Sequence, residues 1–516
     1  MSEGAGDAPA AAPAPAAGRE RVGAGEIALL ALLVAVGLLL RLGDFTEPWT
    51  SAGWQQVGAV ISVEARNFHE QGWWSLRFAP ALDVAPPPDG RWDFYMHHPP
   101  GLALLVSLSF ALFGVAEWSA RLVPVAASLL ELLAIWAITR RLFGRRAALV
   151  AAALCATLPA TAFYGSLVDD IGPALMVFVA AAFALHLRDL ERPSRGTFAA
   201  QLAMLAAAAA VNWQGVEVAG VLGLHYVLQR RLRRAVALFA LALIVPALHL
   251  LHIRWVMGAL DEPGRWGTLL DAFLWRSWGG VEQFGGAQGS TGRLGDNLLR
   301  LYTLPGLALA ALGLLRLRRT RWPWALVALA AFALIDMAIF LEGSARHEYW
   351  CTTLAPVLLP LAGAGAVLAV DLVRGAGPAA RGALLGALAL GAGGWGAWLT
   401  AQRFEVIEST QLRDLGTLIR EHTQPGDNVA TCEMLTYPML YYAQRRMQGE
   451  VADQHLSRLR KAPPEKPGHW FVLPERKLAP HDHEALLALL QQTYAETVLK
   501  LPDGTEVHLF DLSQRR

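Results

Sequence analysis

Long apolar runs separated by short polar connectors constrain the fold of this chain more than any other feature. A helix needs about 20 residues to cross a bilayer. Runs that approach this length lie at 26–40, 120–139, 146–164, 171–187, 197–211, 215–229, 234–256, 299–315, 323–341, 350–373 and 382–400. Only 17% of the 516 residues are charged, whereas a soluble domain has about 25%. We therefore predict an α-helical polytopic membrane protein.

Every second connector between these runs is basic. The basic connectors are 140–146, 186–196, 229–234, 316–321 and, more weakly, 374–381. Short loops rich in Lys and Arg stay in the cytoplasm. All the basic connectors lie on the same side of the membrane only if the apolar run 101–115 makes no net crossing. We therefore expect a re-entrant or surface-lying helix there. The chain then has about eleven crossings, with the N-terminus in the cytoplasm and the C-terminus outside.

The two ends of the chain differ from the membrane region in composition. Residues 1–25 are rich in Ala, Pro and Gly and are predicted to form a disordered cytoplasmic tail. The run that follows leads to Arg41 instead of a cleavage site, which favours a signal anchor. We assign 26–402 to the membrane domain and 403–516 to a small α/β domain on the outer face. Its predicted helices are 412–423, 436–446 and 483–492, and its strands are 428–433, 469–475, 496–501 and 506–512.

Two connectors on the predicted outer side are long. The first, 42–100, is an aromatic-rich loop that is too polar to cross a bilayer, and the second, 257–298, is Gly-rich and contains Trp275 and Trp278. The second is expected either to form a flap over the same face or to be a plain interfacial loop. Charges that interrupt apolar segments are usually functional. Those near the outer ends of the runs are Asp169, Asp170, Glu217, Asp336, Glu342, Arg346, His347 and Glu348.

Several stretches resemble a known family. MHHPPG (96–101), EWSARLVPVAAS (117–128) and YGSLVDD (164–170) resemble the N-terminal half of the GT-C membrane glycosyltransferases, as do HEYW (347–350) and LAPVLLPLAG (354–363) for a later segment. The chain is most similar to glycosyltransferase family 39 and its bacterial relatives, which include protein O-mannosyltransferases and the lipid A aminoarabinose transferase. The resemblance covers roughly 26–230. It implies a GT-C fold and transfer of a sugar from a polyprenyl-phosphate carrier to an acceptor at the outer face, with inversion.

The catalytic carboxylate departs from the family pattern. Family members commonly carry an Asp-Glu pair before an ARN-like segment, but residues 53–67 read GWQQVGAVISVEARN. A phosphate leaving group needs no strong general acid, whereas the acceptor hydroxyl needs a carboxylate to take its proton. We predict Asp169 as this base, with Asp170 as its partner and Glu64 as the main competitor. Alternatively, the two aspartates cap the helix that begins near Ile171.

Cations are expected to hold the donor phosphate. The candidates are Arg66, His97, His98, Arg346 and His347. The histidines could instead pack at the membrane interface, and Arg66 could contact solvent or lipid headgroups. Further candidates for the site are Asp44, Glu47, Glu217 and Glu348. No metal-ligand spacing and no cofactor motif are found, and the dependence on a divalent metal is left open.

The predicted function is an inverting glycosyltransferase of the bacterial inner membrane, with its C-terminal domain in the periplasm or outside the cell. The expected partners are a polyprenyl-phosphate sugar donor, an envelope lipid, glycan or protein acceptor, and the bilayer. Nucleic acid is excluded because the basic residues form no binding face. A transporter or flippase is the first alternative, although no internal repeat is found. A non-catalytic envelope-assembly scaffold is the second, because the Asp-Glu pair is absent.

The topology can be tested by labelling single cysteines in intact cells. Cys155, Cys351 and Cys432 are first removed. An impermeant thiol reagent should then label Gln448→Cys in the C-terminal domain but not Arg318→Cys in a basic connector. Labelling of the second variant and not of the first would reverse the predicted orientation.

Overall fold

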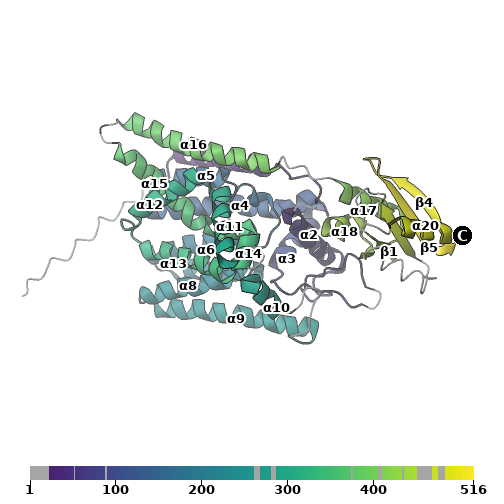
Figure 1. Ribbon diagram of the computed structural model, residues 1–516. Coiled ribbons are helices and arrows are strands. Elements are labelled where there is room, and N and C mark those ends of the chain that lie inside the picture. Colours follow the sequence, from purple (N-terminus) through teal and green to yellow (C-terminus); the bar gives the residue numbers. More distant parts are fainter. Residues whose placement is uncertain are drawn as a thin grey trace, which may run out of the picture.

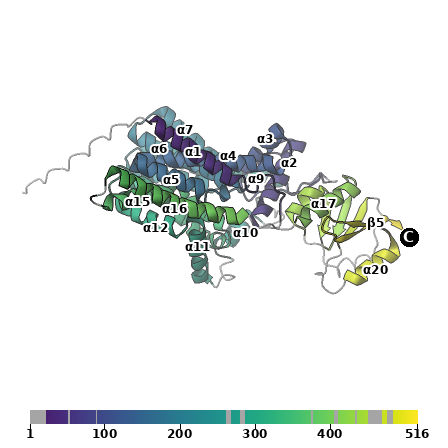
Figure 2. The same cartoon turned by 90° about the horizontal axis from the view of Figure 1, so that it is seen from above.

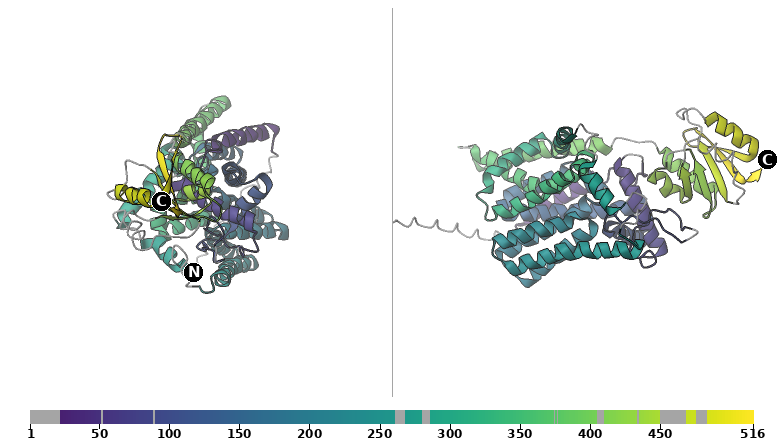
Figure 3. Two further views of the ribbon diagram at one scale, coloured as in Figure 1. Left: turned by 90° about the vertical axis from the view of Figure 1, so that its right-hand side faces the viewer. Right: turned by 60° about the horizontal axis from the view of Figure 1, so that its bottom comes forward.

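The computed structural model describes residues 22–50, 53–87, 90–260, 268–279, 286–373, 375, 377–404, 410–432, 435–449, 468–474 and 483–516. Most of the predicted tail, 1–21, lies outside these ranges. A body of roughly parallel helices and a smaller domain that contains a β-sheet make up the molecule (Figure 1). The sheet domain lies beyond one end of the helices (Figure 3). The predicted combination of a helical membrane region and a C-terminal α/β domain is confirmed.

The helical body confirms a multi-pass membrane protein. Within the described residues, six helical segments are long and apolar enough to cross a membrane: α1 (Ala24–Arg41), α4 (Glu117–Phe143), α6 (Pro173–Glu191), α9 (Leu232–Met257), η4 with α15 (Glu348–Leu372) and α16 (Pro378–Phe404). Shorter helices pack among them: α3 (Gly101–Phe113), α5 (Arg145–Thr157), α7 (Arg195–Val211), α8 (Gln214–Leu228), α12 (Leu304–Leu317) and α13 (Pro323–Ile339). The number of crossings stays a prediction.

Two predicted runs are broken by the structure. In the run 146–164, α5 ends at Thr157 because Leu158 precedes a proline and takes an extended conformation; the chain then turns into η1 (Tyr164–Ser166). In the run 299–315, α11 (Gly286–Tyr302) meets α12 at an angle of 97°. Thr303 lies between them with a φ of 61° and caps the new helix through its side chain. Apolar composition alone did not reveal either break.

The two long connectors contain helices. The first, expected as a loop, holds α2 (Gly53–Gln71), which packs against α3 and is largely buried. The second holds α10 (Leu269–Leu274), the π-helix η2 (Trp275–Gly279) and most of α11. Residues 261–267 and 280–285 of the predicted flap lie outside the described residues. A further short helix, α14 (Leu341–Arg346), contacts η2 and α11.

The C-terminal domain is a five-stranded mixed sheet with the order β2-β1-β3-β5-β4. Its elements are α17 (Gln411–His422), β1 (Asn428–Thr431), α18 (Tyr437–Ala443), β2 (Arg446–Gly449), β3 (His469–Pro474), α20 (His483–Thr493), β4 (Tyr494–Lys500) and β5 (Glu506–Arg515). The predicted closing hairpin is confirmed by the antiparallel pairing of β4 with β5. The predicted helix 436–446 is too long, because Gln444 takes a left-handed conformation that ends α18 before β2 begins.

The basic connectors gather at one end of the helical body, which we call the basic end. Glu26 at the start of α1 lies 3.1 Å from Arg140 and 3.2 Å from Arg145. Asp189 near the end of α6 pairs with Arg231 and Arg234 beside the start of α9. Helix α1 runs from this end toward the C-terminal domain (Figure 2). The basic connectors and the C-terminal domain therefore lie at opposite ends, as the alternation of charge requires.

Arg41 joins α1 to α4 and α5. Its side chain is completely buried, and Nε donates to Ser128 Oγ at 2.7 Å. The two terminal nitrogens donate to the carbonyl oxygens of Gly37 at 2.8 Å and Thr161 at 2.7 Å, and more distantly to that of Cys155. The carbonyl of Thr161 lies in the turn that follows α5, where the guanidinium supplies a hydrogen bond that no helix provides. The carbonyl of Cys155 also accepts from the hydroxyl of Thr161 at 2.6 Å.

Arg41→Leu should therefore destabilise the helical body. Leaving buried acceptors unpaired costs about 1–3 kcal/mol each, so a loss on the order of 3 kcal/mol is expected in unfolding of the purified protein. Arg146→Leu is the matched control, because Arg146 is exposed at the basic end. Equal stability of the two variants would contradict this role of Arg41.

Candidate active site

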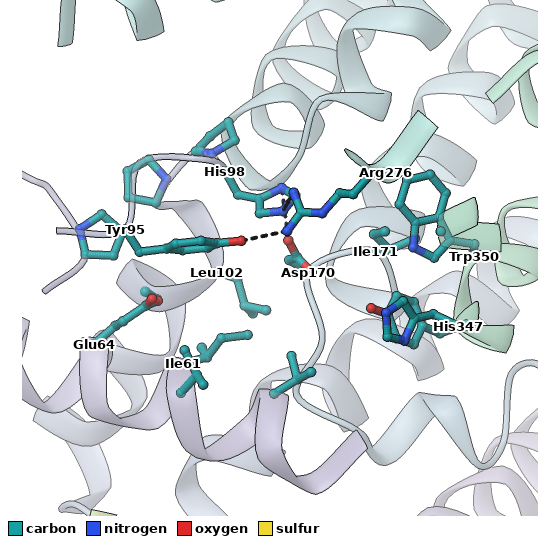
Figure 4. A pocket seen from close by; sticks show the side chains of 18 of the residues that line it. Ile61, Glu64, Tyr95, His98, Leu102, Asp170, Ile171, Arg276, His347 and Trp350 are labelled. Atoms are coloured by element: carbon teal, nitrogen blue, oxygen red, sulfur yellow. Dashed lines mark hydrogen bonds and ion pairs between the residues drawn. The ribbon is translucent and has the colours of Figure 1, made fainter. Parts of the chain in front are cut away.

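A cavity of about 400 Å³ opens between α2, α3, η2 and α14. Its floor is apolar and includes Val57, Ile61 and Leu102 (Figure 4). Its polar lining residues are Glu64, Tyr95, His98, Asp170, Arg276, Glu342, Arg346, His347 and Tyr349. These side chains come from five separate segments of the chain, and the fold alone brings them together. We call this cavity the active-site pocket.

A chain of polar contacts crosses the pocket (Figure 4). Arg276 donates from Nη1 to Nε2 of His98 at 3.0 Å and from Nη2 to the hydroxyl of Tyr95 at 3.0 Å. Nδ1 of His98 lies 3.3 Å from Oδ2 of Asp170, which also accepts from Asn212 at 3.0 Å. Because arginine is only a donor, Nε2 of His98 must accept, and Nδ1 then carries the proton. Burial lowers the pKa of His98 to about 4, so this imidazole is neutral at pH 7.

Glu64 contributes a carboxyl group whose hydrogen bonding is incomplete. It is only 4% exposed, and among the described residues its Oε1 has no hydrogen-bond partner. Burial raises the pKa of Glu64 well above its ordinary value, and the negative charge of Asp170 raises it further. A carboxylate whose pKa is raised in this way is a stronger base and can take a proton from a ligand. Burial also raises the pKa of Tyr95 to about 12, so that hydroxyl stays protonated.

Asp169 and Asp170 have different environments although they are adjacent. Asp170 lines the pocket, whereas Asp169 is buried behind it and accepts from the backbone N–H of Ile171 at 2.8 Å. Burial raises the pKa of Asp169, and the neighbouring Asp170 adds to the effect. The side chain of Asp169 thus holds the turn that leads into α6, but the helix itself begins at Pro173, with Gly172 as its N-cap and no side-chain cap. Of the predicted pair, the structure brings Asp170 to the pocket.

Three basic side chains besides His98 line the pocket. Arg346 forms an ion pair with Glu342. His347 stacks on Tyr349 with ring centroids 5.1 Å apart, and burial lowers the pKa of His347 to about 4, which leaves it uncharged. Arg276 was not among the residues predicted from the sequence. The sequence shows Arg276 only as a single arginine between two tryptophans of a Gly-rich connector. That pattern does not indicate a functional residue until the fold shows what the side chain contacts.

Other predicted residues lie outside the pocket. Arg66 faces the C-terminal domain, where Nη1 donates to the carbonyl oxygen of Tyr441 at 3.0 Å. It is two residues beyond Glu64, which turns it to the opposite side of α2. His97 is buried, and its carbonyl oxygen accepts from the indole of Trp213 at 2.8 Å.

The four remaining candidates are also separate from the pocket lining. Asp44 accepts from Gln55 at 3.1 Å, and the carbonyl oxygen of Glu47 accepts from Arg121. Glu348 pairs with Arg403 at 2.6 Å, and Glu217 lies on α8. Within the described residues, no three side chains of His, Cys, Asp or Glu are grouped as ligands for a metal ion.

Comparisons with known proteins agree on one class. Residues 97–255 match the family model described as dolichyl-phosphate-mannose-protein mannosyltransferase. The chain is similar to ArnT from Cupriavidus metallidurans in the apo state, with a TM-score of 0.64, 16% identity, and coverage of 94% of this chain and 98% of that one. The same protein bound to undecaprenyl phosphate gives a TM-score of 0.64, 15% identity and the same coverage. No curated protein sequence matches the chain significantly.

A further similar structure is the oligosaccharyltransferase of Archaeoglobus fulgidus in the apo form, with a TM-score of 0.55 and 15% identity. That match covers 93% of this chain and 74% of the other. The GT-C fold is thereby shown over nearly the whole chain, and residues 97–255 match the mannosyltransferase family model. The architecture of the chain is similar to that of ArnT, including the C-terminal domain.

Proposed function

We propose that this protein transfers a sugar, with inversion, from a polyprenyl-phosphate-linked donor to a hydroxyl of a cell-envelope lipid, glycan or protein. The observation that carries this proposal is the active-site pocket, where two arginines lie in one buried cavity with the incompletely bonded carboxyl group of Glu64. Cations and a carboxylate are what this reaction needs. The similar ArnT structure bound to undecaprenyl phosphate supports the donor class.

Arg276 and Arg346 are the residues proposed to hold the donor phosphate. Arg276 donates to two uncharged partners, His98 and Tyr95, so no ion pair with them neutralises its charge. Arg346 shares its charge with Glu342, lines the same pocket and lies over the ring of Trp275, the residue before Arg276. A phosphate between them would receive charge-assisted hydrogen bonds from two guanidinium groups. This assignment replaces Arg66 and His97, which lie outside the pocket, while His98 and His347 remain as neutral polar groups of the lining.

Glu64 is proposed as the general base in place of Asp169. The acceptor hydroxyl attacks the anomeric carbon on the face opposite the phosphate, its proton passes to Glu64, and the bond between that carbon and the phosphate oxygen breaks with its electron pair on the phosphate. Burial raises the pKa of Glu64, and the nearby Asp170 raises it further, which makes Glu64 a stronger base than an exposed carboxylate. Asp170 also faces Nδ1 of His98 and thereby positions the imidazole that receives Arg276.

The reaction is proposed to occur at the outer face of the bacterial inner membrane. The basic end of the body would face the cytoplasm together with the N-terminus. The active-site pocket includes α2, which contacts the C-terminal domain through α18 at the other end. A lipid-linked donor and an envelope acceptor would therefore meet in the pocket on the periplasmic or extracellular side.

Arg276→Gln and Arg346→Gln should each weaken binding of undecaprenyl phosphate to the purified protein. A hydrogen bond to a charged group contributes about 1.5–3 kcal/mol, which corresponds to about 10-fold to 100-fold in dissociation constant. Arg77→Gln is the control, because Arg77 is an exposed arginine that does not line the pocket. Affinities in both pocket variants equal to that of the control would show that the phosphate binds elsewhere.

Glu64→Gln should lose about 10² to 10⁴ in the rate of lipid-linked sugar transfer, the usual contribution of a general base, while donor affinity is retained. Asp169→Asn, a change of the same kind in a residue behind the pocket, should keep most of the rate. The opposite pattern, with collapse of the rate in Asp169→Asn and near-normal turnover in Glu64→Gln, would assign the base to Asp169.

A further inference from the structure

A second cavity, of about 340 Å³, lies between the helical body and the C-terminal domain. Its charged lining residues are Arg66 and Glu70 of α2, Glu117 at the start of α4, and Arg413 and Arg420 of α17. The place where α2, α17 and α18 meet can be followed in Figure 1. We call this cavity the interdomain pocket.

Helix α2 separates the interdomain pocket from the active-site pocket. Val57, Ile61 and Glu64 line the active-site pocket, whereas Arg66 and Glu70 line the interdomain pocket. Successive residues of a helix are rotated by about 100°, which places these two sets on opposite faces of α2. A ligand in one pocket is therefore distinct from a ligand in the other.

Arginines outnumber carboxylates in the interdomain pocket, and the carboxylates are partly engaged. Glu117 accepts from the hydroxyl of Tyr442 at 2.6 Å, and Glu70 is 4.0 Å from Arg66. Arg420 is exposed and, within the described residues, has no ion-pair partner. Burial lowers the pKa of Arg66, and the nearby positive charge of Arg420 lowers it further although Glu70 opposes the change. An anion between these two guanidinium groups would relieve their repulsion.

An exposed apolar surface leads to this pocket. Val115, which lines it, is 38% exposed and lies two residues beyond the end of α3. On α3, Leu108 and Leu112 lie one turn apart on the same face and are 46% and 67% exposed, and Phe113 is 51% exposed. In a membrane protein such a surface faces lipid. The pocket thus combines an arginine-rich polar site with an adjoining surface suited to an acyl chain.

We propose that the interdomain pocket binds the phosphate headgroup of a second membrane lipid, whose acyl chain lies along the exposed face of α3. Arg66 and Arg420 supply cations, as does Arg413, which also pairs with Asp414 at 2.9 Å, and Tyr441 and Gln444 add polar groups to the lining. The site goes beyond the proposed function, because the donor phosphate is assigned to the other side of α2. A lipid held there contacts both the helical body and the C-terminal domain and fixes one against the other.

The test measures binding of dioctanoyl phosphatidic acid to the full-length protein in a neutral detergent by native mass spectrometry. The wild type should bind two equivalents. The double variant Arg413→Gln/Arg420→Gln changes two side chains that are not fully buried and should bind one of them at least 10-fold more weakly. Arg276→Gln, in the active-site pocket, should weaken binding of the equivalent in that pocket and leave the equivalent in the interdomain pocket unchanged. The two site assignments can therefore be refuted independently.

Two results would overturn the proposal. If the double variant binds both equivalents as tightly as the wild type, the interdomain pocket is not the second site. If inorganic phosphate displaces the second equivalent of lipid when the two are present at similar concentrations, the pocket recognises free phosphate. The apolar surface of α3 then contributes nothing to binding. Retention of the lipid in the presence of excess inorganic phosphate supports binding of headgroup and chain together.

Discussion

A buried carboxyl group with incomplete hydrogen bonding is the constraint on which the active site depends. Leaving such a group without a partner costs free energy, about 1–3 kcal/mol for a buried acceptor, and the fold must supply that stability elsewhere. Here Glu64 is buried on α2 with Asp170 nearby. Neither carboxyl is neutralised by a direct ion pair with Arg276, which instead donates to His98 and Tyr95. The pocket therefore keeps both an available proton acceptor and an available cation, as an acceptor hydroxyl and an anionic donor would require.

The contacts that hold α2, and with it Glu64, in place lie on the opposite side of this helix. Arg66 donates to a carbonyl oxygen of α18 and lies over the ring of Tyr441 at 5.4 Å. Tyr442 accepts from the backbone N–H of Trp49 at 2.8 Å and donates to Glu117. The C-terminal domain thus fixes the helix whose other face forms the floor of the pocket. This arrangement gives the domain a structural role in the site although none of its described residues lines the pocket.

Sequence alone predicted the elements that depend on local pattern. The apolar runs fall on helices, and the hairpin of β4 and β5 lies where the turn residues of PDG indicated it. The breaks at Leu158 and Thr303 were missed, since hydrophobicity reports burial and not the direction of the chain. At the site, the region of Asp170 was found through the resemblance, but which of two adjacent aspartates faces the cavity depends on the turn. Arg276 was missed because its role comes from contacts with segments nearly 180 residues away in the sequence, such as His98 at a separation of 178.

Glu64 is proposed as the proton acceptor, with its pKa raised by burial and raised further by the charge of Asp170. The pH dependence of the transfer rate tests this assignment directly, because the base must be ionised and activity should fall as pH drops through the pKa of Glu64. Asp170→Asn removes a negative charge that raises this pKa. The residual activity of Asp170→Asn should therefore fall at a lower pH than the activity of the wild type. The pH profile of Glu64→Gln should lack this acid limb. An acid limb that stays in place in Asp170→Asn, or that persists in Glu64→Gln, would contradict the account.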